Sequence, residues 1–111
     1  MVKPPQAHKV KYVTPDIIRR RFNKSQVPRM IAHGQLVPKC LRNGHLKGPE
    51  KRKYPEPYCT RSQTIRYCDS NGQWVVEVHQ YLRPDGTLGA SGKPDPKRLR
   101  VGNTVFTVPQ I

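Results

Sequence analysis

Hydrophobic and polar positions alternate most regularly between Gln73 and Leu82, and this pattern predicts a β-strand. A period of two residues is typical of extended backbone that buries one of its faces. One expected face holds Trp74, Val76, Val78 and Leu82, and the other holds Val75, Glu77, His79 and Tyr81. Residues 69–72 before the strand and residues 83–86 after it have the composition of tight turns. The strand is therefore expected to belong to an antiparallel meander.

Shorter apolar runs predict the remaining strands. They are expected over residues 64–68, 97–101 and 104–108, with the last two joined in a hairpin across Gly102 and Asn103. A further short strand is expected over residues 36–41, where Pro38 restricts it to the edge of a sheet.

The segment from Thr14 to Gly34 has the apolar spacing of helices. Residues typical of a helix N-terminus open it, namely Thr14, Pro15 and Asp16. Apolar residues then recur at near-helical spacing at Ile17, Ile18 and Phe22. Residues 23–26 interrupt the pattern, and Ser25 is expected to cap a second, short helix that ends at Gly34. The segment therefore predicts two helices joined by a turn.

These elements predict an α+β fold, in which an N-terminal helical pair packs on a small antiparallel β-sheet of about four strands. The chain has 111 residues, which fits one domain. Residues 1–13 are expected to form a basic extended arm, because Pro4 and Pro5 oppose helix formation. Residues 14–111 are expected to form the single domain, with a long basic loop at residues 42–57.

The charge of the chain indicates a polyanionic partner. There are 21 Lys and Arg against 7 Asp and Glu, which gives a formal net charge of +14. Phosphate backbones compensate such a charge well, because their neutralisation releases condensed counterions. The excess lies mainly in residues 1–58, which hold 14 Lys and Arg against 3 Asp and Glu. Phosphate contacts are expected from Lys9, Lys11, Arg19, Arg20, Arg21, Lys24, Arg29, Lys51, Arg52 and Lys53.

A second, more selective surface is expected on the strand at residues 73–82 and its neighbours. A ribonuclease that uses no metal needs a base, an acid and cations near the developing phosphorane charge. The acid–base candidates are His79, Tyr81 and Glu77, and the phosphate-binding candidates are Arg83, Lys97 and Arg98. Residues 86–93 are a candidate anion-binding loop of backbone amides, although they lack the Walker pattern.

Aromatic residues interleave with basic ones in the middle of the chain. The aromatic residues are Tyr54, Tyr58, Tyr67 and Tyr81, and the basic ones are Arg52, Lys53, Arg61 and Arg66. Stacking on bases combined with phosphate contacts is the usual way in which proteins hold single strands. The alternative is that Tyr67 and Tyr81 simply pack under the helices.

The run HQYLRPDGTLGASGKPDPKR, residues 79–98, resembles a segment of small uncharacterised bacterial and phage proteins. That resemblance carries no known activity. The expected order of helices followed by antiparallel sheet is similar to that of small ribonuclease toxins, which cleave messenger RNA on the ribosome. The second resemblance is one of architecture only. If the protein is a nuclease, the expected catalytic residues are those of the second surface, namely His79, Tyr81, Arg83, Lys97 and Arg98.

The three cysteines, Cys40, Cys59 and Cys68, do not indicate a disulfide framework, because their number is odd. Together with His45 they are candidate zinc ligands. Structural zinc sites usually have ligands paired two to four residues apart, and the gaps here are longer. We therefore expect neither a metal nor another cofactor. No apolar run approaches the roughly 20 residues of a membrane span, and the N-terminus lacks a secretion signal, so we expect a cytoplasmic protein without membrane contacts.

The leading hypothesis is a basic nucleic-acid-binding protein that is directed to RNA more than to DNA. The alternative is a metal-independent ribonuclease of the toxin type. A further alternative is a structural subunit of a larger complex, with a protein partner. Whether the chain is an enzyme stays open between these hypotheses.

Overall fold

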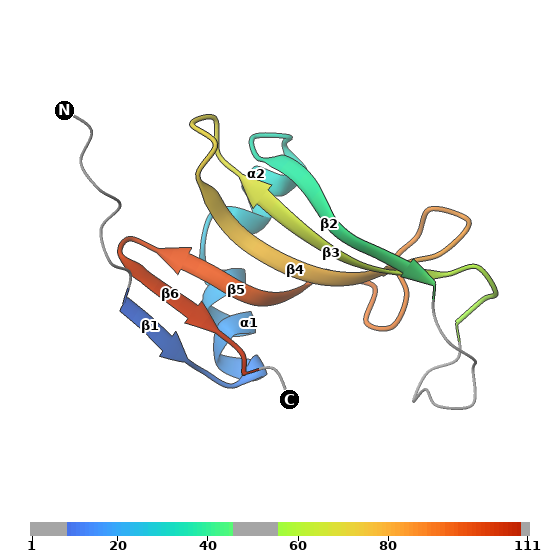
Figure 1. Ribbon diagram of the computed structural model, residues 1–111, viewed down its shortest axis with the longest axis horizontal. Coiled ribbons are helices and arrows are strands. Elements are labelled where there is room, and N and C mark those ends of the chain that lie inside the picture. The colour runs from blue at the N-terminus through green and yellow to red at the C-terminus, as the bar shows by residue number, and fades with distance from the viewer. Residues whose placement is uncertain (1–8, 46–55, 110–111) are drawn as a thin grey trace.

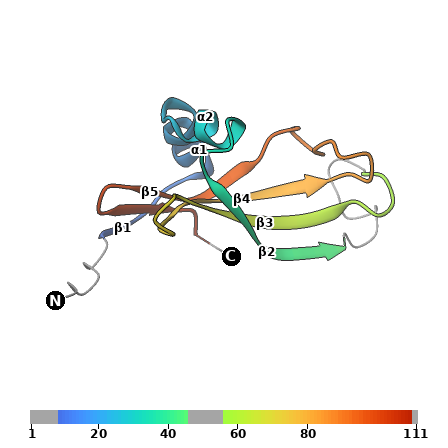
Figure 2. The same cartoon turned by 90° about the horizontal axis from the view of Figure 1, so that it is seen from above.

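The computed structural model describes residues 9–45 and 56–109, which form a six-stranded mixed sheet with two short helices on one face (Figures 1 and 2). The elements in chain order are β1 (Lys9–Tyr12), α1 (Pro15–Lys24), α2 (Val27–Ala32), β2 (Val37–His45), β3 (Arg61–Cys68), β4 (Trp74–Leu82), β5 (Asp95–Val101) and β6 (Thr104–Thr107).

The sheet has the strand order β1-β6-β5-β4-β3-β2. Strands β2 to β6 form a continuous antiparallel meander, in which short turns join β3 to β4 and β5 to β6. Strand β1 pairs with β6 in parallel, so the first described strand lies beside the last one at one edge (Figure 1). Strand β2 forms the opposite edge.

The prediction of an α+β fold with an antiparallel sheet of about four strands is wrong, because the described residues are mostly strand and form a mixed sheet of six strands. Residues 9–12, which belong to the expected basic arm, form β1. The edge strand expected over residues 36–41 continues to His45, so it takes in the start of the expected loop. Strand β1 and the extension of β2 were missed because both strands lie at edges of the sheet. All of their residues are exposed, so their sequences lack the alternation of apolar and polar residues that marks a half-buried strand. The rest of that loop, residues 46–55, lies outside the described residues.

The two helices form as the local signals predict. The Thr14 hydroxyl accepts a hydrogen bond from the Ile17 amide at 3.3 Å, and Pro15 starts α1. The Ser25 hydroxyl accepts from the Val27 amide at 3.2 Å, but Ser25 is the C-terminal cap of α1. The N-terminal cap of α2 is Gln26, whose side chain makes no capping hydrogen bond, so the expected capping role of Ser25 needs correction. The expected packing of the two helices also needs correction. Helix α1 packs against β5, whereas α2 lies beside α1 and buries only Val27.

The hydrophobic core lies between the helices and one face of the sheet. It consists of Ile18, Phe22, Val27, Leu36, Ile65, Val76, Val78, Leu99 and Phe106. Residues directly opposite each other on neighbouring strands share a face. Ile65 pairs with Val78, so both belong to the face that the helices cover. The other face, which we call the open face, carries no helix of the described residues (Figure 2).

A candidate nucleic-acid interface on the open face

A β-bulge in β4 places Trp74 on the open face. Tyr67 pairs with Val76 and Cys68 pairs with Trp74, so Val75 is an extra residue in the strand. Val75 packs against the core beside Val76. The prediction that Trp74 shares a face with Val76 is therefore wrong, because the bulge reverses the alternation. Trp74 instead contacts two arginines of β5.

The guanidinium groups of Arg98 and Arg100 lie over the Trp74 ring, with their Cζ atoms 5.2 Å and 4.7 Å from its centroid. The Glu77 carboxylate binds one of these arginines and a third one from β3. It accepts from Arg98 at 3.1 Å and from Arg66 at 2.8 Å. The Glu77 side chain is 8% exposed, and those of Arg66 and Arg98 are 33% and 44% exposed. We call Arg66, Trp74, Glu77, Arg98 and Arg100 the arginine–tryptophan cluster.

The open face carries a surplus of positive charge. In the arginine–tryptophan cluster, Arg66 and Arg98 share the Glu77 carboxylate, and Arg100 adds a third guanidinium group beside Trp74. On the neighbouring edge strand, Lys39 lies opposite Arg66, and Arg42 lies opposite Thr64. Both of these basic residues are exposed. The result is a band of cations across strands β2, β3 and β5, with an aromatic ring within it.

His79 lies farther along the same face, two residues after Glu77. Its Nε2 atom and the Ser62 hydroxyl are 2.7 Å apart and share a hydrogen bond, and its ring meets the Tyr81 ring edge-on with centroids 4.8 Å apart. Burial lowers the pKa of His79, Lys97 lowers it further, and Asp95 acts in the opposite direction. The imidazole is therefore neutral near pH 7. A neutral imidazole beside a hydroxyl offers both a donor and an acceptor to a ligand.

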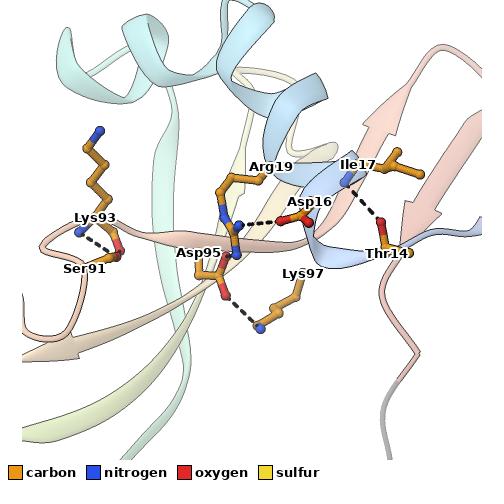
Figure 3. A network of polar contacts seen from close by, with 8 residues as sticks. All are labelled: Thr14, Asp16, Ile17, Arg19, Ser91, Lys93, Asp95 and Lys97. Atoms are coloured by element: carbon orange, nitrogen blue, oxygen red, sulfur yellow. Dashed lines mark hydrogen bonds and ion pairs between the residues drawn. The ribbon is translucent and has the colours of Figure 1, made fainter. Parts of the chain in front are cut away.

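Lys97 belongs to an ion-pair chain that links the sheet to α1 (Figure 3). Its Nζ atom lies 2.9 Å from one oxygen of Asp95, and Arg19 lies 3.4 Å from the other oxygen. Arg19 also pairs with Asp16 at 3.1 Å. Two of the expected phosphate-binding residues, Arg19 and Lys97, therefore already have carboxylate partners.

Arg83 does not belong to the open-face interface. Its Nε atom lies 2.8 Å from Glu56, whose side chain is only 3% exposed, and this hydrogen bond raises the pKa of Arg83. The same carboxylate accepts from the Ala90 amide at 2.6 Å. The loop that was expected to cradle an anion through its amides thus holds a carboxylate of the protein itself. Glu56, Arg83 and the loop at residues 86–93 form a structural clamp.

The residues expected to contact phosphates do not gather on the open face. Lys9 and Lys11 lie on β1; Arg19, Arg20, Arg21 and Lys24 lie on α1; Arg29 lies on α2. Arg21 covers the Phe106 ring at 4.3 Å. Lys51, Arg52 and Lys53 lie outside the described residues. By contrast, the expected second surface is partly assembled, because β4 and β5 place His79, Tyr81, Lys97 and Arg98 on neighbouring strands.

The sequence pattern missed three residues of the open face, namely Ser62, Trp74 and Arg100, whereas Arg66 was among the basic residues expected to contact single strands. The basic residues on alternate positions of residues 96–100 were a usable signal, since Arg98 and Arg100 must share a face of a strand. Tyr67 does pack against the core, where burial raises the pKa of its hydroxyl. Tyr81 contacts His79 on the open face instead.

The expected zinc ligands do not come together. Cys40, Cys59 and Cys68 are free thiols. Within residues 9–45 and 56–109, no three His, Cys, Asp or Glu side chains are grouped so that they could hold a metal ion. None of the helices in this part of the chain has the length and apolar character needed to cross a membrane.

Comparison with known proteins adds no relative. No protein-family model, curated protein or solved structure matches this chain. The proposed function therefore rests on the residues of this chain and their geometry.

Proposed function

We propose that this protein binds nucleic acid, RNA in preference to DNA, through its open face. The observation that carries the proposal is the arginine–tryptophan cluster, in which Glu77 holds two guanidinium groups in place beside an indole ring. Guanidinium forks pair with phosphate oxygens in a bidentate geometry, and their planes also stack on bases. Ordering two of the arginines in advance lowers the entropy lost on binding.

The preference for RNA rests on the polar row next to the cluster. Ser62, Thr64 and His79 occupy neighbouring positions on the open face of β3 and β4. Such hydroxyl and imidazole groups can donate to and accept from a ribose 2′-hydroxyl, which DNA lacks. A surface made only of lysines and arginines would contact phosphates of either nucleic acid equally.

The test is a binding titration with RNA and DNA of the same sequence at about 50 mM and about 200 mM salt. We expect tighter binding to RNA, and an affinity that falls by roughly 10- to 1,000-fold over this salt range as counterion release becomes less favourable. Absence of binding at the lower salt concentration would overturn the proposal. Equal affinity for RNA and DNA would remove the preference while leaving nucleic-acid binding in place.

A second candidate function is RNA cleavage without a metal, and the neutral His79 beside Ser62 and Lys97 is what favours it. In this reaction His79 takes the proton of a 2′-hydroxyl, whose oxygen attacks the adjacent phosphorus. The bond from phosphorus to the 5′-oxygen breaks, and the Tyr81 hydroxyl gives that oxygen its proton. The products are a 2′,3′-cyclic phosphate and a 5′-hydroxyl.

A gel-shift experiment with labelled RNA distinguishes the two functions, because it shows binding and cleavage together. Bound RNA that stays intact supports binding alone, whereas fragments that disappear in His79→Gln support cleavage. Fragments that persist in His79→Gln come from a contaminating nuclease. If neither a shift nor fragments appear, the structural subunit of a larger complex becomes the hypothesis to pursue.

A further inference from the structure

We infer that the open face takes a single strand rather than a duplex, and that an unpaired base stacks on the arginine–tryptophan cluster. This inference rests on the proposed function and names the form of nucleic acid that the same surface would accept. It follows from the shape of the sheet and from the positions of the aromatic residues on it.

The sheet is too wide to enter the groove of a duplex and contact its bases. The major groove of B-form DNA is about 12 Å wide and admits an α-helix or a two-stranded ribbon. Neighbouring strands lie about 4.8 Å apart, so the six strands of this sheet span roughly 24 Å. The cluster lies on β3, β4 and β5, in the interior of the sheet and not at an edge. A duplex resting on this face would meet it through phosphates alone, with its bases stacked out of reach.

The cluster has the chemistry that an unpaired base requires. Trp74 is partly exposed, and the Arg98 side chain above it is 44% exposed. An indole ring and guanidinium planes both stack on bases of any sequence. Because Glu77 holds Arg98 in this position, the side chain is already ordered before a base binds.

Two further aromatic residues lie on the open face, in two different directions from the cluster. Tyr12 lies across the strands, on β1: it lies opposite Thr107, which in turn lies opposite Arg98, and it is 72% exposed. Tyr81 lies along β4, seven residues after Trp74 and therefore about 20 Å away. Lys39 and Arg42 lie on the edge strand β2, which β3 separates from β4. Separated rings with cations between them suit a strand whose bases are splayed apart.

The experiment uses the full chain and two readouts. The fluorescence anisotropy of a dye-labelled probe gives the affinity of every variant, and the emission of Trp74, the single tryptophan of the protein, reports stacking in the wild type. The probes are a short oligouridine, and a duplex RNA hairpin of similar charge. We expect the oligouridine to bind more tightly and to quench the Trp74 emission, whereas the hairpin binds weakly without quenching. Trp74→Leu should weaken oligouridine binding by roughly 5- to 150-fold, and the affinity for the hairpin should change by less than about twofold.

Two further variants keep this test sharp. Trp74→Phe retains an aromatic ring, so it should recover most of the affinity and exclude a simple loss of folding as the cause. Ile17→Ala removes an apolar side chain that is 41% exposed on α1, on the helix-covered side of the sheet, and it should leave the affinity unchanged. Equal affinity for oligouridine and hairpin, with no quenching and no effect of Trp74→Leu, would overturn the inference while nucleic-acid binding stands. Failure of both probes to bind would overturn the proposed function itself.

Discussion

At two places in the described residues, a single carboxylate holds two cations. Glu77 bonds Arg66 and Arg98, and Asp95 bonds Arg19 and Lys97. The scarcity of acids makes this necessary, since the chain has 7 Asp and Glu for 21 Lys and Arg. Each shared carboxylate also keeps two like charges in fixed positions. At the scale of the residue, the acids therefore determine where the basic surface is ordered.

The Glu56 clamp gives a first prediction at this scale. A Cβ added at Gly89 would lie 2.5 Å from a Glu56 oxygen, and the carboxylate is pinned by Arg83 and the Ala90 amide. Gly89→Ala should therefore lower the free energy of unfolding by about 1–3 kcal/mol in urea titrations. Gly44→Ala is the matched control, because open space surrounds Gly44.

A double-mutant cycle identifies the clamp as the cause. In a Glu56→Ala background the clash is absent, so Gly89→Ala should there cost less than about 0.5 kcal/mol. An equal cost in both backgrounds would show that Gly89 is constrained by something other than the clamp.

The lowered pKa of His79 gives a second prediction. Burial and Lys97 depress it below the ordinary value near 6.5, so the unfolded chain binds the proton more readily than the folded one. The stability that the neutral imidazole contributes is complete above about pH 6.5 and is lost as the pH falls through that value toward the folded pKa. Urea unfolding from about pH 7.5 to pH 5 should show a smaller loss in His79→Gln than in the wild type.

NMR titration of the same imidazole tests the cause of this shift. Lys97→Met removes a neighbouring positive charge and should raise the midpoint for His79. An unchanged midpoint would leave burial as the whole explanation and would separate Lys97 from the His79 site.

At the scale of the element, local signals predicted both helices and strands β3 to β6, whereas tertiary pairing decided β1, the extension of β2 and the bulge in β4. Thr14 and Pro15 define the start of α1 through contacts within four residues, so sequence alone reveals it. Strand β1 pairs with β6, whose residues lie 95 positions later in the chain, and no local sequence pattern predicts this pairing. The bulge at Val75 is equally invisible, and it alone decides that Trp74 belongs to the candidate site.

The cap of α1 gives a prediction at this scale. Thr14→Ala removes the acceptor for the Ile17 amide. Because α1 packs against β5, weakening the helix should lower the stability of the whole domain. We expect a loss of about 1 kcal/mol in the free energy of unfolding. Thr14→Ser keeps a hydroxyl and should retain most of the stability. If the alanine and serine variants proved equally stable, the hydroxyl would have no capping role.

At the scale of the whole molecule, the sheet separates two basic surfaces. Exposed cations on the helices, among them Arg20, Lys24 and Arg29, lie on the side that was expected to meet phosphates. The open face combines its cations with aromatic rings and a neutral histidine. Composition predicted a polyanionic partner but could not say which surface meets it, because net charge carries no information about faces.

Equal removal of charge from the two surfaces tests the central claim most directly. Arg42→Gln with Arg100→Gln takes two charges from the open face, and Arg20→Gln with Lys24→Gln takes two from α1. The measurement is the affinity of each variant for the oligouridine at one salt concentration, with urea unfolding to confirm the fold. We predict a loss of roughly tenfold or more for the open-face variant and less than about threefold for the helix variant. Equal losses, or a larger loss for the helix variant, would contradict the claim that the open face is the nucleic-acid interface.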